Sequence, residues 1–472
     1  MRRWLVLVKL ALIGGAVALA VEHRTDLAGT AATQALRRAG FPDAAVTVSE
    51  LSAEQTRALV RLDRQGTVAG TLTLHHPLDA LREGRIERLD LTDARLRIDV
   101  AKDGGLSIAG HPLADTAGAA GKGGPAGDGA LAIPIDAIQF GDTAVTLATP
   151  RGTAVGTLRL TMTRDGAIHR GQAALTAPAK GLSVLTHWTG AGTIAETVGT
   201  LTAKARLTWD GTALKAQGDL LLADLAGRFG PVSASGINGV LSLPSLFPPV
   251  VAPGQTLAVK LLDVGLPLTD GTLRFGYGTK GRLNVEHAEW HWAGGVLRAD
   301  PFAIDPAAPR GTVTLRAERV HLGPMLEMVA VDGLEASGTV SGSLPVRIEA
   351  DSVHLDNGLL EADAPGTLRY DPENPPGFLK GEEGSPTALL MGALTDFRYD
   401  TLSATMEGQA GGELAVGIAI RGSNPAFYDG YPVALNLKVS GALDRILRQS
   451  LDTYRIPETV RDRMTEFQRK NP

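Results

Sequence analysis

The stretch LTAKARL at residues 201–207 alternates apolar and polar residues at every position. Successive side chains of a β-strand point to opposite faces, so this alternation predicts a strand with one apolar and one polar face. The same pattern recurs at residues 68–74, 95–100, 158–162, 340–348, 414–420 and 433–439. The chain is therefore expected to be mainly β.

Short turns separate these predicted strands. Several contain Asp-Gly or Asn-Gly pairs, such as Asp165-Gly166, Asp270-Gly271 and Asn357-Gly358, and such pairs are the strongest short signal for a β-hairpin. About 25 antiparallel strands are expected, and at about 4.8 Å per strand they would extend over roughly 120 Å. Few helical segments are available to cover the apolar face, so the sheet must either close into a barrel or curl into an elongated antiparallel β-sheet groove, or trough.

The composition of the 472-residue chain narrows its possible functions. Hydrophobic residues make up 44% of it but aromatic residues only 4%, which fits a trough that must stay open. The net charge of −5 argues against a nucleic-acid partner. The chain has no cysteine, which excludes disulfides and thiolate chemistry. Recognisable catalytic and cofactor-binding motifs are also missing from the sequence, so we expect no enzyme activity, no catalytic residues and no cofactor.

The N-terminus carries a membrane-targeting signal. Arg2 and Arg3 precede an apolar run at residues 4–21, which is about long enough to cross a hydrocarbon core as a helix. We expect a transmembrane helix over residues 1–22 that anchors the chain in the bacterial inner membrane by a single pass, with a cytoplasmic N-terminus and a periplasmic body. A cleaved signal peptide is the alternative.

The remaining chain divides into three expected regions. An N-terminal helical segment, residues 23–43, contains a helix over residues 26–39. The elongated β-groove covers residues 44–440, and short C-terminal helices follow over residues 441–472. Inside the groove region, the low-complexity residues 112–130 predict a flexible loop. Ser385-Pro386 provides an N-cap and first-turn pair for a helix over residues 385–397.

The C-terminal third resembles a known family. The segments SLPVRIEADSVHLDNGLLEADAPGTLRYDPE (343–373) and NPAFYDGYPVALNLKVSGALDRILRQSLDTYRIPETVRDRM (424–464) are similar to the YdbH-type branch of the AsmA-like envelope proteins. This resemblance implies a bridge-like protein whose β-groove carries phospholipid between the inner and outer membranes. It also implies a small outer-membrane lipoprotein partner that adds strands at the C-terminal edge.

Two candidate sites follow from the strand pattern taken together with the resemblance. The first is a lipid-binding groove formed by inward-facing apolar residues: Val340, Leu344, Val346, Ile348, Leu414, Val416, Ile418, Ile420, Val433, Leu435 and Leu437. The second is a C-terminal partner-binding site formed by Tyr428, Leu443, Ile446, Leu447 and Leu451.

Each candidate has a simpler alternative. The inward residues could form a sealed core, because apolar strand faces usually pack, and the protein would then be a non-transporting envelope scaffold. Tyr428 could be a turn residue, and the terminal helices could be a plain end cap. His287, Glu289 and His291 share one strand face, but we interpret them as polar outer-face residues rather than as metal ligands, because further ligands are missing.

Overall fold

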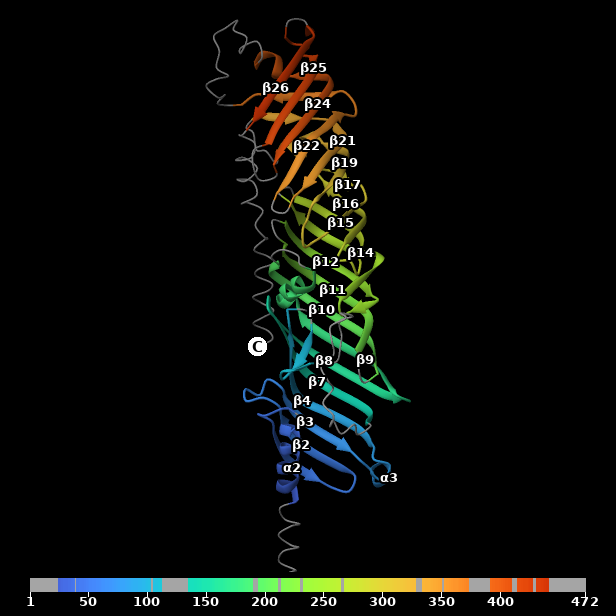
Figure 1. The fold of residues 1–472 in the computed structure, drawn as a ribbon. Helices are drawn as coiled ribbons and strands as arrows, with labels where there is room; N and C mark the ends of the chain where they lie inside the picture. The colour runs from blue at the N-terminus through green and yellow to red at the C-terminus, as the bar shows by residue number, and fades with distance from the viewer. Residues whose placement is uncertain are drawn as a thin grey trace, which may run out of the picture. The chain divides into compact units, whose positions relative to one another are not determined.

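A computed structural model describes most of the chain. The described residues are 24–38, 40–102, 105–112, 135–189, 194–210, 214–229, 232–264, 267–327, 333–349, 352–372, 391–409, 414–427 and 430–440. They contain twenty-six strands and a few short helices (Figure 1). The chain divides into two compact units: unit 1 contains residues 1–227 and 239–252, and unit 2 contains residues 228–238 and 253–472.

Unit 1 is an antiparallel sheet with one parallel pair. Its fully included strands are β1 (Ala45–Leu51), β2 (Gln55–Arg61), β3 (Ala69–His75), β4 (Ile86–Val100), β5 (Leu106–Ile108), β6 (His111–Pro112), β7 (Ile135–Thr149), β8 (Gly152–Asp165), β9 (Ile168–Pro178), β10 (Ile194–Trp209) and β13 (Ser245–Leu246). Hydrogen-bonded ladders join β1, β2, β3, β4, β7, β8, β9 and β10 in that order. The pair β4 and β7 is parallel.

Three short helical segments accompany this sheet. The helix α2 (Arg24–Arg38) lies against β1, where Thr33 Oγ1 accepts a hydrogen bond of 2.9 Å from the backbone N–H of Val46. The helix α3 (Leu78–Arg82) connects β3 to β4. A 3₁₀ segment (Ala179–Leu185) leads into α4 (Thr186–Thr189). The helix predicted over residues 26–39 is therefore confirmed, whereas α3 and the segment 179–189 were not predicted.

Unit 2 continues the antiparallel pattern within itself. Its fully included elements are β15 (Pro267–Tyr277), β16 (Leu283–Trp292), β17 (Gly295–Ala299), β18 (Phe302–Ile304), β19 (Gly311–His321), α5 (Leu322–Glu327), β20 (Leu334–Ala336), β21 (Thr339–Ile348), β22 (Val353–Ala362), β23 (Gly366–Tyr370), β24 (Phe397–Gln409), β25 (Leu414–Ser423) and β26 (Val433–Ser440). The remaining strands β11 (Leu214–Phe229), β12 (Val232–Leu243) and β14 (Pro249–Asp263) contribute residues to both units. The prediction of a mainly β chain with an open, curled antiparallel sheet is confirmed.

Two of the predicted hairpin turns are wrong. Asp270-Gly271 lies inside β15 and Asn357-Gly358 lies inside β22. In each pair the first residue adopts a positive φ, 47° for Asp270 and 49° for Asn357, and the strand register shifts by one residue there. Both pairs are β-bulges, which bend a strand and increase its twist. The sequence signal misled because a tight turn and this kind of bulge both need a residue with positive φ.

Glycines within the strands allow neighbouring backbones to approach closely. A Cβ atom at Gly171 would lie 2.0 Å from the carbonyl oxygen of Thr161, and one at Gly218 would lie 1.9 Å from that of Lys204. Real side chains never tolerate such contacts, so these positions require glycine. Bulges and glycine kinks together curl a sheet, and Figure 1 shows the curl within each unit.

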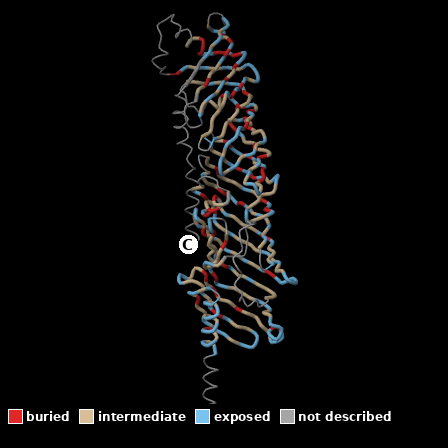
Figure 2. Tube along the Cα trace, viewed as in Figure 1, coloured by how far each residue is buried: buried red, intermediate tan, exposed pale blue. Residues whose placement is uncertain are grey.

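Unit 2 contains a packed hydrophobic core. Its most deeply buried members include Val320, Val340, Leu360, Phe397 and Tyr399, each at most 1% exposed. Buried positions gather on the C-terminal strands in Figure 2, whereas β7, β8 and β9 of unit 1 carry mainly intermediate and exposed positions. Large apolar side chains are therefore packed more completely in unit 2.

Other predictions fall partly or wholly outside the described residues. These include the transmembrane segment 1–22, nearly all of the loop 112–130, and the C-terminal helices 441–472. Pro112, expected in the loop, belongs to β6. Of the helix predicted over residues 385–397, residues 391–394 are helical, but Phe397 is the first residue of β24. Among the helices that the structure describes, none combines the length and the apolar character needed to cross a bilayer.

Candidate functional site

One face of the unit 1 sheet carries a continuous row of apolar side chains. The register places neighbouring residues directly opposite one another from strand to strand. The row consists of Ala58, Leu72, Leu91, Phe140, Leu160, Ala173 and Ala205. A parallel row, two residues along each strand, includes Leu74, Leu89, Ile138, Met162 and Leu207. Cross-strand neighbours on one face lie close together, so the rows form one apolar surface.

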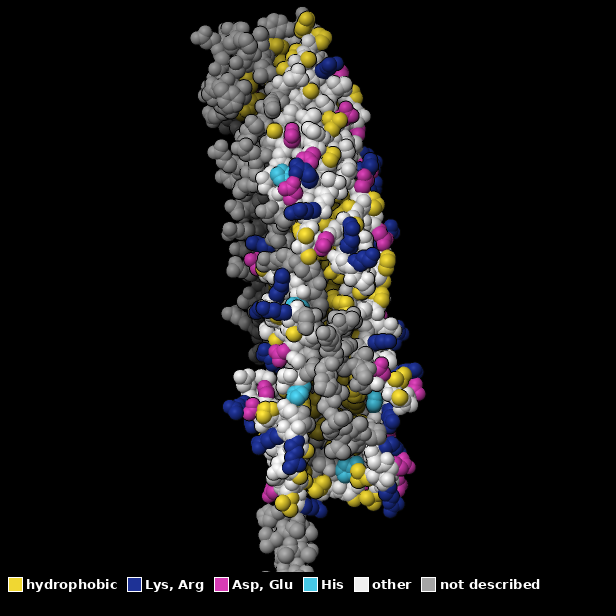
Figure 3. All heavy atoms as spheres, in the orientation of Figure 1, with side chains coloured by type: hydrophobic (Ala, Val, Ile, Leu, Met, Phe, Trp, Pro, Cys, Tyr) yellow, Lys and Arg dark blue, Asp and Glu magenta, His cyan; other side chains and the backbone are white. Residues whose placement is uncertain are grey.

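The large side chains of the first row are incompletely covered. Leu72, Leu91, Phe140 and Leu160 are all half-buried, neither packed into a core nor fully exposed. Figure 3 shows hydrophobic side chains gathered in a hollow over β7 and β8. A packed core would bury such residues completely. We refer to this surface of unit 1, defined by the two rows, as the apolar face.

The opposite face of the same strands is polar. Along β8 the inward Leu158, Leu160 and Met162 alternate with Arg159 and Thr161. Arg159 donates two hydrogen bonds, of 2.5 and 2.9 Å, to the carboxylate of Asp142 on β7. These hydrogen bonds hold the pKa of Asp142 below its ordinary value. The two faces of the sheet therefore differ sharply in polarity, as the alternation predicts.

The register also gathers the predicted groove residues of unit 2 on one face of the sheet. Leu344 lies opposite Leu315 on β19, and Ile420 lies opposite Leu435 on β26. The described groove positions that lie an even number of residues from these along β21, β25 and β26 share the same face: Val340, Val346, Ile348, Val416, Ile418 and Val433. The structure does not describe the side chains of Leu414 and Leu437.

The unit 2 groove residues differ in how far they are covered. Val340 and Ile420, at 1% and 2% exposure, and the buried Leu344 belong to the packed core. Val416 is also buried. The remaining described side chains are half-buried: Val346, Ile348, Ile418, Val433 and Leu435. A lipid-binding role for these residues stays a prediction, and the four buried ones fit the alternative of a sealed core.

Buried hydrogen bonds stabilise the packing of the unit 2 core. Asn424, 2% exposed, donates from Nδ2 to the carbonyl oxygens of Gly392 and Ala393, at 3.1 and 3.3 Å. It thereby holds the segment that presents the buried side chains of Ala393 and Leu394 to the core. The hydroxyl of Tyr399 donates to the carbonyl oxygen of Ser337 at 2.7 Å. Buried polar groups with satisfied hydrogen bonds specify one packed arrangement.

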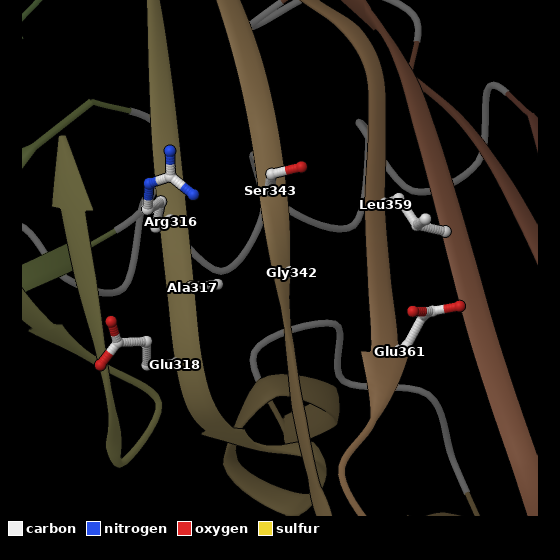
Figure 4. Close-up of a pocket in the computed structure, with 7 residues that line it drawn as sticks. All are labelled: Arg316, Ala317, Glu318, Gly342, Ser343, Leu359 and Glu361. Atoms are coloured by element: carbon white, nitrogen blue, oxygen red, sulfur yellow. The ribbon is translucent and has the colours of Figure 1, made fainter. Parts of the chain in front are cut away.

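A hollow on unit 2 offers a poor site for lipid. Its lining includes Arg316, Glu318, Ser343 and Glu361, which lie around the side-chain-free Gly342 (Figure 4). Arg316 donates to Asp300 at 2.7 and 2.9 Å, and Arg298 donates to Glu318 at 2.7 Å. Charged groups that already form ion pairs make this surface unsuitable for acyl chains.

The other sequence candidates either form ion pairs or lie outside the described residues. Glu289 accepts a hydrogen bond of 2.5 Å from Arg298, and His287 lies 3.8 Å from Glu289. Across the described part of the chain, no group of three or more His, Asp or Glu side chains is arranged to hold a metal ion. The proposed partner-binding residues Tyr428, Leu443, Ile446, Leu447 and Leu451 all lie outside the described residues.

The sequence interpretation placed the groove residues only in unit 2 and left out the apolar face of unit 1. The alternation at residues 68–74 and 158–162 was visible in the sequence. It showed which side chains share a face, but it could not show that the face lacks complete cover. Cover depends on contacts between residues far apart in the chain, such as those of Asn424 with residues 392–395.

A family model described as "YdbH-like: Intermembrane phospholipid transport protein YdbH" matches residues 143–465, more than half of the chain. The similarity seen in the C-terminal third therefore extends upstream into unit 1. Searches among curated proteins and among solved structures return no match.

Proposed function

The chain belongs to the YdbH-like family of intermembrane phospholipid transport proteins, and we propose that it carries phospholipid acyl chains along the apolar face of unit 1. The observation that carries this proposal is the incomplete burial of Leu72, Leu91, Phe140 and Leu160 in one cross-strand row. Each methylene group exposed to water costs about 0.8 kcal/mol. An apolar row whose large side chains are only partly covered lowers this cost for a lipid that leaves its bilayer, and no catalytic group is needed.

The row is long enough for an acyl chain. It crosses seven strands, β2, β3, β4, β7, β8, β9 and β10, and six spacings of about 4.8 Å give about 29 Å. One leaflet of a bilayer accounts for about half of the roughly 30 Å hydrocarbon core. An acyl chain of ordinary length therefore fits along the row with room to advance.

The membrane arrangement is part of the same proposal. Residues 1–22 anchor the chain in the bacterial inner membrane with the N-terminus in the cytoplasm, and the sheet lies in the periplasm. The apolar run at residues 4–21 and the preceding Arg2 and Arg3 support this orientation. A small outer-membrane lipoprotein would add strands near the C-terminal end, with Tyr428 and the apolar positions of residues 443–451 as its docking residues.

Photo-crosslinking tests the proposed lipid path directly. A benzophenone amino acid replaces either Leu160 on the apolar face or its neighbour Thr161 on the polar face, in the full-length chain in cells. We expect crosslinked phospholipid at position 160 and little or none at position 161. Equal crosslinking at both positions, or none at position 160, would contradict lipid carriage on this face.

A second function has its own support. The packed core of unit 2, with Leu360 and Phe397 fully buried, fits a scaffold that holds partners and carries no lipid. Crosslinking also separates these two functions, because a scaffold gives protein adducts and no lipid adduct at position 160.

A further inference from the structure

Three exposed leucines lie toward one edge of unit 1. Leu78 and Leu81 on α3 are 56% and 46% exposed, and Leu27 on α2 is 62% exposed. Leu78 and Leu81 are three positions apart, so they share one face of the helix, while Ala80 between them is buried. The helix therefore turns its small residue toward the protein and its large apolar residues toward the outside.

The register shows that α2 and α3 reach the same edge of unit 1, namely the end of the sheet at which β1 and β3 finish and β2 begins. Along α2, Arg37 contacts Ala44, Thr33 contacts Val46, and Gly29 lies beneath Val46 and Val48. The helix is therefore antiparallel to β1, and its first turn, with Leu27, points toward the end of β1 at Leu51.

The same edge contains the end of β3. Leu51 pairs with Thr56 near the start of β2, and Gln55 pairs with His75, the last residue of β3. The helix α3 begins three residues later, at Leu78. Leu27, Leu78 and Leu81 thus lie toward one edge of unit 1, although they come from separate segments.

The apolar run near the N-terminus comes just before α2 in the chain. The run at residues 4–21 ends only two residues before α2 begins at Arg24. We propose that this edge, defined by Leu27, Leu78 and Leu81, rests on the phospholipid bilayer that holds the apolar run, with the three leucines inserted among the lipids. The inference rests on the proposed membrane anchor and goes beyond lipid carriage itself.

Physical chemistry favours the bilayer as the occupant. Transfer of a leucine side chain from water to an apolar environment is favourable, and apolar side chains can be buried at the headgroup and acyl boundary of a membrane without crossing it. Arg82 is 80% exposed and lies 3.7 Å from the carboxylate of Asp79 at the surface, so its guanidinium can extend to lipid phosphates. The contact also brings β2 and β3, where the apolar row begins, next to the lipids.

Site-specific fluorescence tests this contact cleanly, because the chain contains no cysteine. Single variants Leu78→Cys and Leu81→Cys carry an environment-sensitive nitrobenzoxadiazole label, and the full-length protein is placed in phosphatidylethanolamine and phosphatidylglycerol nanodiscs. Val155→Cys is the matched control, because Val155 is 55% exposed on β8 of the same unit but lies near the opposite ends of the strands. We expect brominated lipids to quench positions 78 and 81 at least three-fold more than position 155.

Each other outcome overturns the contact. Quenching at positions 78 and 81 equal to that at position 155 shows that the edge stays in water. A blue-shifted label that brominated lipids do not quench shows that a protein covers the edge instead. Photo-crosslinking at Leu160 keeps lipid carriage separate: lipid adducts there without quenching at positions 78 and 81 remove the docking surface and leave the transport proposal intact.

Discussion

Truncation of one leucine in each unit tests whether unit 2 has a packed core and unit 1 has an apolar face that is only partly covered. The two losses of folding stability are compared. Leu360 on β22 is fully buried within the core of unit 2, whereas Leu160 on β8 is half-buried on the apolar face. Leu360→Ala leaves a cavity among packed neighbours, which typically costs about 2–5 kcal/mol of folding stability. Leu160→Ala removes a side chain that already contacts solvent, so we expect a loss of about 1 kcal/mol or less.

Urea unfolding followed by tryptophan fluorescence measures both variants. Trp209 lies on β10 of unit 1, and Trp290 and Trp292 lie on β16 of unit 2. Leu360→Ala should lower the unfolding midpoint of unit 2 clearly, while Leu160→Ala should barely change that of unit 1. The phospholipid that copurifies should fall only in Leu160→Ala. Equal losses of stability in the two variants would refute the distinction between a packed core and an uncovered face.

Three further predictions follow from other contacts. Gly218→Val should destabilise unit 1 by several kcal/mol in urea unfolding, because its Cβ would lie 1.9 Å from the carbonyl oxygen of Lys204. Gly141→Val on β7 serves as the less damaging control, because Gly141 is not among the glycines with positive φ and its Cβ would lie 3.6 Å from the carbonyl oxygen of Leu91, an ordinary contact. Asn424→Ala removes the donor to buried carbonyl groups and should cost about 1–3 kcal/mol, and unchanged stability would contradict the fastening role. The pKa of Glu289 lies below its ordinary value of 4.5 because Arg298 donates a hydrogen bond to the carboxylate, so this pair stabilises the fold above that value and the stabilisation is lost as pH falls through the lowered pKa. Glu289→Gln should flatten the pH dependence of unfolding below about pH 4.5, and an unchanged acid profile would contradict it.

Local patterns in the sequence are sufficient to predict the strands and their faces. The alternation at residues 201–207 depends only on the geometry of a single strand, and the register places Leu201, Ala203, Ala205 and Leu207 on one face opposite β9. The helix α2 is likewise predictable from its own residues. These features need no knowledge of distant contacts.

Features that depend on distant contacts were missed. Asp270-Gly271 resembles a turn in its own sequence, but in the fold it is a bulge inside β15, and Gly271 lies directly beneath the indole ring of Trp290. Val340 and Val346 look equivalent in the strand pattern, yet one is buried in the core and the other is half-buried. The difference arises from packing partners that lie many residues away along the chain.

Native mass spectrometry of the full-length protein, extracted in mild detergent, tests the central claim most directly. The variant Phe140→Asp/Leu160→Asp places two carboxylates on the apolar face, and Thr161→Asp places one on the polar face of the same strand as a control. The account predicts phospholipid adducts on the unaltered protein and on Thr161→Asp, and their loss from the double variant while the far-ultraviolet circular dichroism stays unchanged. Absence of phospholipid from the unaltered protein, or its undiminished presence on the double variant, would contradict the account.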